Sequence, residues 1–243
     1  MNGRIPIRAQ KLWLALLTGL LLSFPCLDKA QAPSSLSNQT VSSARDHNER
    51  GIALARQGDQ AAAVDEFRAA VRLKPGYAEA YYNLGMALEQ LGKEQPAIAA
   101  LRSAVRLQPD SAVIHLGLAL ALAQSSDQKN ALIEFRQSIH LDPNSAVAHD
   151  NLGLLLVQSG QLEDALAEFR EAIRLDPGKV DSQIHFGTTL ASLRRPQEAL
   201  DALREAVHKA PDDPGAHYEL AKVLWDTHDL QGALDELDRK SVV

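Results

Sequence analysis

The sequence is poor in several residue types that would define a function by themselves. Cysteine occurs once in 243 residues, at Cys26, and aromatic residues make up only 5%. A single cysteine excludes a disulfide within the chain, and so few aromatic rings argue against a platform on which nucleic-acid bases stack. There is no pair of histidines around a glutamate at helical spacing, no cysteine pair and no glycine-rich phosphate loop. Because these signals are missing, we expect no catalytic residues, no metal site and no cofactor.

The charge balance narrows the range of partners. The net charge is −6, with 25 basic and 31 acidic residues. Residues 1–32 hold four of the basic residues and one of the acidic ones, which leaves 21 and 30 in the rest of the chain, or −9. An acidic body without a basic cluster repels phosphate backbones and anionic lipid. We therefore expect no nucleic-acid partner, and contact with a membrane only through the N-terminal segment if that segment stays attached.

The first 32 residues are typical of a secretory signal peptide. Their basic start consists of Arg4, Arg8 and Lys11. Residues 12–27 form an almost uncharged apolar run, and residues 30–32 have the small-x-small form of a cleavage site,. The run is shorter than the roughly 20 residues that a membrane span needs. We predict export to the periplasm or the outside of the cell. The alternative is an uncleaved membrane anchor, because Pro33 directly follows the predicted cleavage site and signal peptidases tolerate proline there poorly.

The rest of the chain repeats itself every 34 residues. Residues 33–43 are polar and rich in serine, which is typical of a flexible linker. Five prolines then recur at intervals of 34 residues: Pro75, Pro109, Pro143, Pro177 and Pro211. Each proline ends a pair of short amphipathic patterns that are joined by a turn. The spacing predicts the units 44–77, 78–111, 112–145, 146–179, 180–213 and a shorter 214–243.

Small and large side chains recur at fixed positions of this unit, counted from its first residue. Position 8 is always small: Gly51, Gly85, Ala119, Gly153, Gly187 and Ala221. Position 20 is always alanine, and position 24 is always large: Phe67, Leu101, Phe135, Phe169, Leu203 and Leu237. A small residue lets two helices approach closely, and a large one fills the gap beside it. Ser111, Ser145 and Asp213 precede predicted first helices, where their oxygens can cap free N–H groups.

This pattern resembles the tetratricopeptide repeat, a 34-residue helix-turn-helix unit with small residues at positions 8 and 20 and proline at position 32. The resemblance covers about 200 of the 243 residues. It implies an all-α fold, a right-handed solenoid of about six helix pairs.

Position 4, often tryptophan in that family, is histidine in four units: His47, His115, His149 and His217. Equivalent residues of successive helices lie about 8–10 Å apart, whereas a zinc–nitrogen bond measures about 2 Å. We therefore interpret these histidines as packing residues and not as metal ligands.

The resemblance also implies a binding groove, because positions 2, 5, 6, 9, 12 and 13 of the first helices receive a peptide in the family. In the central units these positions give the predicted contacts Tyr82, Asn83, Met86, Gln90, Leu116, Leu120, Gln124, Asp150, Asn151, Leu154 and Gln158. An exposed apolar strip usually has a partner, and amide groups bond a ligand backbone in both directions. The alternative is that Leu116, Leu120 and Leu154 pack against adjacent repeats.

We predict a non-catalytic scaffold that binds a protein or peptide in this groove. The alternative is a membrane-anchored envelope assembly factor that works through the open C-terminal repeat. Leu234 and Leu237 of that repeat have no further helix to cover them, so the end could stack on another copy or another protein, or the chain could be a fragment. An enzyme is the least favoured class.

Overall fold

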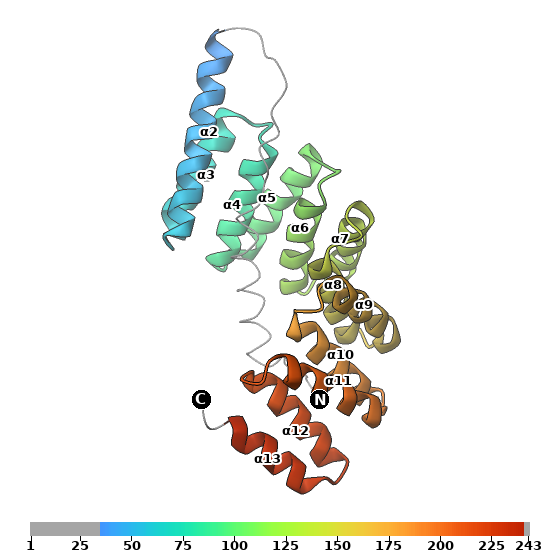
Figure 1. Ribbon diagram of the computed structural model, residues 1–243. Coiled ribbons are helices and arrows are strands. Elements are labelled where there is room, and N and C mark those ends of the chain that lie inside the picture. Colours follow the sequence, from blue (N-terminus) through green and yellow to red (C-terminus); the bar gives the residue numbers. More distant parts are fainter. Residues whose placement is uncertain (1–34, 241–243) are drawn as a thin grey trace. The chain divides into compact units, whose positions relative to one another are not determined.

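The structure is a computed structural model that describes residues 35–240, and the side chains of residues 43–238. This part of the chain contains twelve helices and no strand (Figure 1). The predicted all-α class is confirmed. The chain divides into two compact units, which meet between Ser126 and Asp127. The predicted signal sequence lies outside the described residues, so export and cleavage stay predictions.

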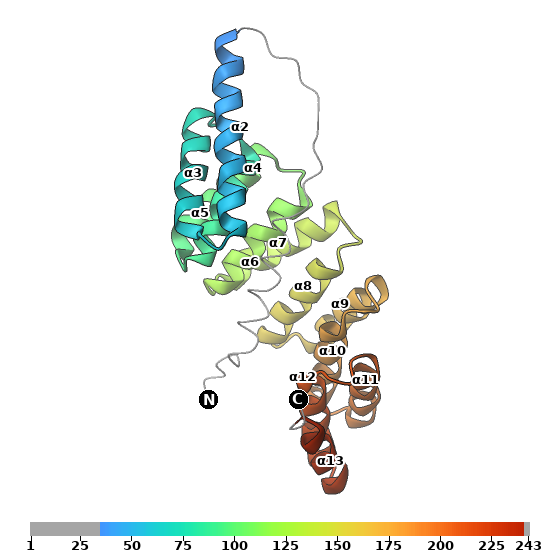
Figure 2. The same ribbon diagram turned by 60° about the vertical axis from the view of Figure 1, so that its left-hand side comes forward.

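The first unit contains five helices. They are α2 (Ser35–Arg56), α3 (Gln60–Leu73), α4 (Ala78–Gln90), α5 (Glu94–Leu107) and α6 (Ala112–Gln124). α2 pairs with α3 and α4 pairs with α5, while α6 packs on both α4 and α5 (Figure 2). α2 begins at Ser35, inside the stretch for which the sequence predicts a linker. No proline or glycine lies between Ser35 and Gly51, so nothing stops the first helix of the repeat from extending toward the N-terminus.

The second unit contains seven helices. They are α7 (Gln128–Leu141), α8 (Ala146–Gln158), α9 (Leu162–Leu175), α10 (Val180–Ser192), α11 (Pro196–Lys209), α12 (Pro214–Asp226) and α13 (Leu230–Lys240). α8 pairs with α9, α10 with α11 and α12 with α13. Among the first helices of the repeats, α8 contacts α10 and α10 contacts α12. These contacts place one face of each first helix beside the next.

The interlock of small and large residues that the sequence predicts is confirmed within both units. A Cβ atom added to Gly153 would lie 2.6 Å from the ring of Phe169, and one added to Gly85 would lie 2.5 Å from Leu101. Real Cβ atoms essentially never approach other atoms so closely. Glycine at position 8 therefore lets each first helix lie directly against the large side chain of its partner.

Turns and caps define where the helices end. Gly58, Gly92 and Gly160 have positive φ at position 15 of their repeats, and Arg194 and His228 adopt φ values of 60° and 67° at the same position. A non-glycine residue at position 15 is strained, because its side chain disfavours positive φ.

The side chains of Ser145 and Asp213 accept bonds from Ala148 and Ala216 as predicted. Ser111 precedes α6 but makes no side-chain cap bond, because serine at the cap position does not by itself fix the rotamer that reaches the helix N–H groups.

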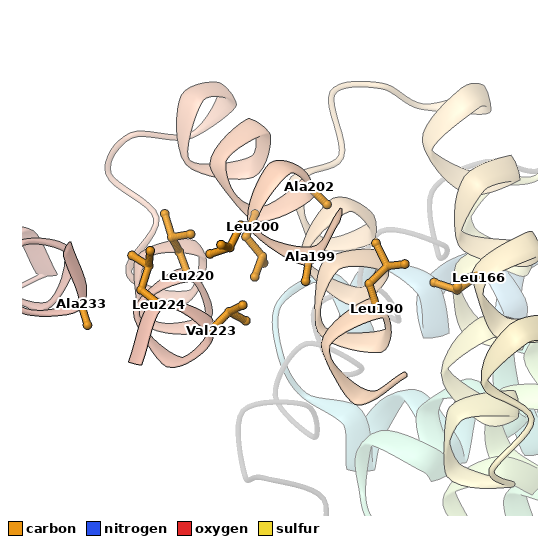
Figure 3. Packing of buried hydrophobic residues seen from close by; sticks show 10 residues of the cluster. Leu166, Leu190, Ala199, Leu200, Ala202, Leu220, Val223, Leu224 and Ala233 are labelled. Atoms are coloured by element: carbon orange, nitrogen blue, oxygen red, sulfur yellow. The ribbon is translucent and has the colours of Figure 1, made fainter. Parts of the chain in front are cut away.

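The core of the second unit runs through the helix pairs. Side chains from α9 to α13 form one buried cluster that includes Leu166, Leu190, Leu200, Leu220 and Leu224. Figure 3 shows these side chains between neighbouring helices. With no disulfide available, this burial is the main stabilising contribution, at roughly 25 cal/mol per Å² of apolar surface removed from water.

Candidate functional site

Most of the predicted groove residues in the first unit are inside the protein. Tyr82, Asn83, Met86, Leu116 and Leu120 are 0 to 4% exposed. Gln90 is half-buried and Gln124 is exposed. A ligand could therefore touch few atoms of the first five residues without a change in packing.

The buried polar residues of the first unit connect its two helix pairs. Asn83 of α4 donates its amide N–H to the Asn48 carbonyl oxygen of α2 at 3.0 Å. Asn48 in turn donates to the Glu79 carboxylate at 3.2 Å and to the Tyr77 hydroxyl at 3.4 Å. Tyr82 lies against Gly117, whose added Cβ would be 2.8 Å from its ring. Positions 5 and 6 thus hold successive repeats together here.

The same positions carry a buried ionic cluster in the second unit. The Asp150 carboxylate of α8 lies 3.2 Å from Nζ of Lys179 and 3.1 Å from Nδ1 of His185 on α10. Burial raises the pKa of Asp150, but His185 and Lys179 lower it more strongly, to about 2. Asn151 is also buried and donates to the Val147 carbonyl. Asp150 therefore stays ionised and joins two repeats.

Only part of the predicted set faces solvent. Gln124 and Gln158 are exposed, and Leu154 and Gln90 are half-buried. These four side chains are accessible to a ligand, whereas the other seven already contact protein. The assignment of the set as a binding groove stays a prediction.

A hollow of about 890 Å³ lies between α10 and α12, and we call it the α10–α12 hollow. It is lined by Thr188, Ala191, Ser192, Arg194, Pro196, Glu219, Lys222, Val223, Asp226 and Thr227. Thr188, Ala191 and Ser192 occupy positions 9, 12 and 13 of their repeat, and Lys222 and Asp226 occupy positions 9 and 13 of the next. The hollow thus has the register of the predicted groove, but it lies in the last two repeats.

The lining of the hollow contains both apolar and polar residues. Val223 is buried and belongs to the core cluster (Figure 3). The hydroxyls of Thr188 and Ser192 donate at 3.0 Å to carbonyl oxygens of the preceding helical turn. Their oxygen lone pairs can still accept a hydrogen bond from a ligand N–H.

Charged residues of both signs line the hollow. Nζ of Lys222 lies 2.5 Å from Glu219 and 5.6 Å from the centre of the Tyr218 ring. The Lys222 side chain is about half exposed, so this ion pair contributes little to stability, and the ammonium group can bond a ligand oxygen instead. Arg194 and Asp226 add one exposed charge of each sign.

Sequence reasoning placed the site in the central repeats because it searched for apolar residues. Leu116 and Leu120 are 4% and 3% exposed, so they lie inside the protein. In the last two repeats position 9 is polar, with Thr188 and Lys222, and polar residues of this kind usually remain at the surface. A polar residue at position 9 is thus the sequence feature that accompanies the accessible α10–α12 hollow.

Two general kinds of site are absent from the described residues. Residues 35–240 contain no group of three or more histidine, cysteine or acidic residues that could hold a metal ion. None of the helices in the described part of the chain is long and apolar enough to cross a membrane.

Comparison with known proteins places the chain among repeat proteins. Models of the tetratricopeptide repeat match residues 48–112, 95–146 and 185–242, and another model of this repeat matches residues 146–179. No curated protein sequence matches the chain.

Solved structures share the fold at low sequence identity. MamA from Desulfovibrio magneticus RS-1 is 22% identical with a TM-score of 0.65, and the match covers 69% of this chain and 94% of MamA. YrrB, a tetratricopeptide repeat protein with an unusual peptide-binding site, is 23% identical with a TM-score of 0.63, covering 76% and 97%. PilF from Pseudomonas aeruginosa is 24% identical with a TM-score of 0.62, covering 68% and 75%. These likenesses confirm the predicted repeat solenoid.

Proposed function

The chain belongs to the tetratricopeptide repeat family, and we propose that it is a non-catalytic scaffold that binds an extended segment of a partner protein in the α10–α12 hollow. The observation that carries this proposal is the hollow itself. In this hollow, groove positions 9 and 13 of the last two repeats are accessible, since Thr188 is half-buried and Ser192, Lys222 and Asp226 are exposed. Its volume, about 890 Å³, lies within the range of about 300–1,000 Å³ that is usual for ligand pockets.

The chemistry of the walls favours a peptide in extended form. Such a peptide presents backbone N–H and C=O groups along its length, whereas a helix has already bonded most of them internally. Ser192 and Thr188 can accept from ligand N–H groups, and Lys222 and Arg194 can donate to ligand oxygens. Ala191 and Val223, which also line the hollow, supply a small apolar contact. This combination matches a short peptide with an apolar side chain between polar neighbours.

A photo-cross-linker in the hollow tests this proposal in the native cell. A photoreactive amino acid at Ser192 should give a covalent adduct with a partner, and the cross-linked residue of the partner should lie in an extended segment. The same group at the exposed Arg136 on α7 should give no such adduct. Equal adducts at both positions, or none at Ser192, would contradict a binding role for the hollow.

Export is part of the proposed function and is supported by the N-terminal sequence alone. We propose that the mature protein starts at or near Pro33 and works in the periplasm or outside the cell. The intact mass of the protein from the envelope fraction tests this. A full-length mass in the membrane would support the alternative of an uncleaved anchor.

Exposed apolar side chains of the last helix pair, α12 and α13, support a second candidate function, which is the assembly of a complex through this face. Trp225, Leu230 and Leu234 are 59%, 50% and 52% exposed. The residue equivalent to Leu234 in the preceding repeat, Leu200, is buried in the core cluster. Leu234→Glu should then abolish assembly with a partner protein or a second copy while leaving the fold intact. An unchanged hydrodynamic mass and unchanged partner binding would contradict this second candidate.

A further inference from the structure

A histidine at position 4 of the repeat makes two contacts at once. His149 of α8 has its Nδ1 2.7 Å from Oε2 of Glu168 on α9, and its Nε2 3.2 Å from the carbonyl oxygen of Pro143. The His149 side chain is 10% exposed. One ring therefore joins the two helices of its repeat to the turn that precedes them.

The same geometry recurs in the last repeat. His217 of α12 has its Nδ1 2.5 Å from Oε2 of Glu236 on α13, and its Nε2 2.7 Å from the carbonyl oxygen of Pro211. In the first unit, Nδ1 of His47 on α2 lies 2.6 Å from Oε2 of Glu66 on α3. The contact between the histidine and the glutamate is thus built at least three times.

The glutamate accompanies the histidine through the repeats of the sequence. Position 23 is glutamate in every repeat that has histidine at position 4: Glu66, Glu134, Glu168 and Glu236. In the two other repeats position 4 is Tyr81 or Gln183, and position 23 is Ala100 or Ala202. Positions 4 and 23 change together, so the contact between histidine and glutamate is a recurrent feature of the repeat.

Both ring nitrogens face groups that accept hydrogen bonds. A carbonyl oxygen cannot donate, so Nε2 of His149 must carry a hydrogen. An ionised Glu168 cannot donate either, so Nδ1 must carry one as well, which makes the ring an imidazolium. If the proton lies on the carboxyl oxygen instead, the pair still holds one proton more than a neutral ring beside a carboxylate. Loss of that proton leaves the lone pair of one ring nitrogen facing an oxygen that can only accept a hydrogen bond. One of the two contacts of the ring then breaks.

The charges around His149 act in the same direction. Its hydrogen bond to Glu168 raises the pKa of His149, burial lowers it, and the Pro143 carbonyl and Glu171 raise it further.

Other packed elements supply few competing charges at His149. From α10 and the turn before it, His185 and Lys179 bond to Asp150 on α8. On α7 the basic side chains are exposed: Lys129, Arg136 and His140. The charged groups that shift the pKa of His149 are Glu168 and Glu171, both on α9.

We propose that His149 and His217 form proton-dependent contacts, which join the paired helices of a repeat to the preceding turn and make the second unit more stable as the pH falls through neutrality. A histidine whose pKa is higher in the folded state stabilises the fold fully below its unfolded pKa of about 6.5. That contribution is lost as the pH rises through the raised pKa. The inference does not depend on the proposed binding function.

Histidine ¹⁵N NMR spectra of the full chain test the protonation directly. At pH 7.0, His149 and His217 should show both ring nitrogens protonated, and the exposed His140 and His208 serve as reference signals in the same spectra. Neutral rings at His149 and His217 at this pH, with Glu168 and Glu236 ionised, would overturn the proposal. This measurement uses the unaltered protein, so it does not depend on the folding of a variant.

Urea unfolding tests the effect on stability. The midpoint of the wild-type chain should be higher at pH 6.0 than at pH 8.5, by roughly 0.5 M. The variant His149→Gln/His217→Gln should show a smaller difference, because glutamine, as at Gln183, fits position 4 without titrating, whereas the part that the buried carboxyl of Glu89 contributes should remain. The control variant His140→Gln/His208→Gln should keep the whole difference. If the urea midpoints of His149→Gln/His217→Gln and of the wild type differ equally between pH 6.0 and pH 8.5, the proposal is overturned.

Discussion

Gly153→Ala tests the close approach of paired helices that organises each repeat. The added Cβ would lie 2.6, 2.8 and 2.9 Å from three ring atoms of Phe169, which is fully buried. Alanine favours a helix by about 1 kcal/mol over glycine. Overpacking a filled core costs typically about 1–3 kcal/mol, and a ring without free space to move into lies at the upper end of that range. We expect a net loss of about 1–2 kcal/mol in the free energy of unfolding.

Urea denaturation followed by circular dichroism at 222 nm measures this loss. Gly76→Ala is the matched control, since an added Cβ at Gly76 meets no atom within 4 Å, and it should change stability little. Gly153→Ala/Phe169→Leu should be less destabilised than the sum of its two single variants, because the smaller side chain relieves the clash. If Gly153→Ala is as stable as the wild type, or more stable, then the interlock is not a tight constraint and our account of the repeat register is wrong.

Two further substitutions test local features of the two units. Burial, with a contribution from Glu94, raises the pKa of Glu89 to about 7, so ionisation of this carboxyl destabilises the fold as the pH rises from about 4.5 through that value. Glu89→Gln should therefore raise the free energy of unfolding at pH 8 by about 1 kcal/mol, after allowance for partial exposure. At pH 5 the gain should be much smaller. An equal gain at both pH values in urea titrations would contradict the raised pKa of Glu89. His228→Gly should raise the midpoint of thermal unfolding, because φ at residue 228 is 67° and glycine adopts this angle without strain. The gain in the free energy of unfolding should be about 0.5–1 kcal/mol. A lower midpoint would contradict the presence of this strain.

The sequence was sufficient to predict the fold because its signals depend on local geometry. A proline every 34 residues fixes where helix pairs end, and the glycines at position 8 fix how the two helices pack. The predicted pairing of Gly153 with Phe169 follows from spacing alone. Residues 1–32 carry an equally clear pattern, but a cleavage event is not a packing arrangement, so the fold does not test it.

The site was harder to predict because exposure depends on neighbouring repeats. Position 5 is polar in Asp150, which suggests a surface residue, yet Lys179 at the end of the same repeat and His185 from the following repeat enclose it. Position 9 is polar in Lys222 as well, and there the side chain stays accessible. A single sequence does not show which polar residue has a charged partner across the repeat boundary. The pairing of position 4 with position 23 was readable in the sequence, although its role needs the distances from His149 to Glu168 and Pro143.

Peptide affinity for the α10–α12 hollow is the most direct test of the proposed function. Peptides of twelve residues selected from a random library against the full chain provide the probe, and fluorescence anisotropy measures their dissociation constants. Lys222→Glu should weaken binding by roughly tenfold, which corresponds to about 1.4 kcal/mol, whereas Lys129→Glu, at an exposed lysine on α7, should leave affinity unchanged. Equal affinities of the two variants and the wild type would contradict the proposal that this hollow binds the partner.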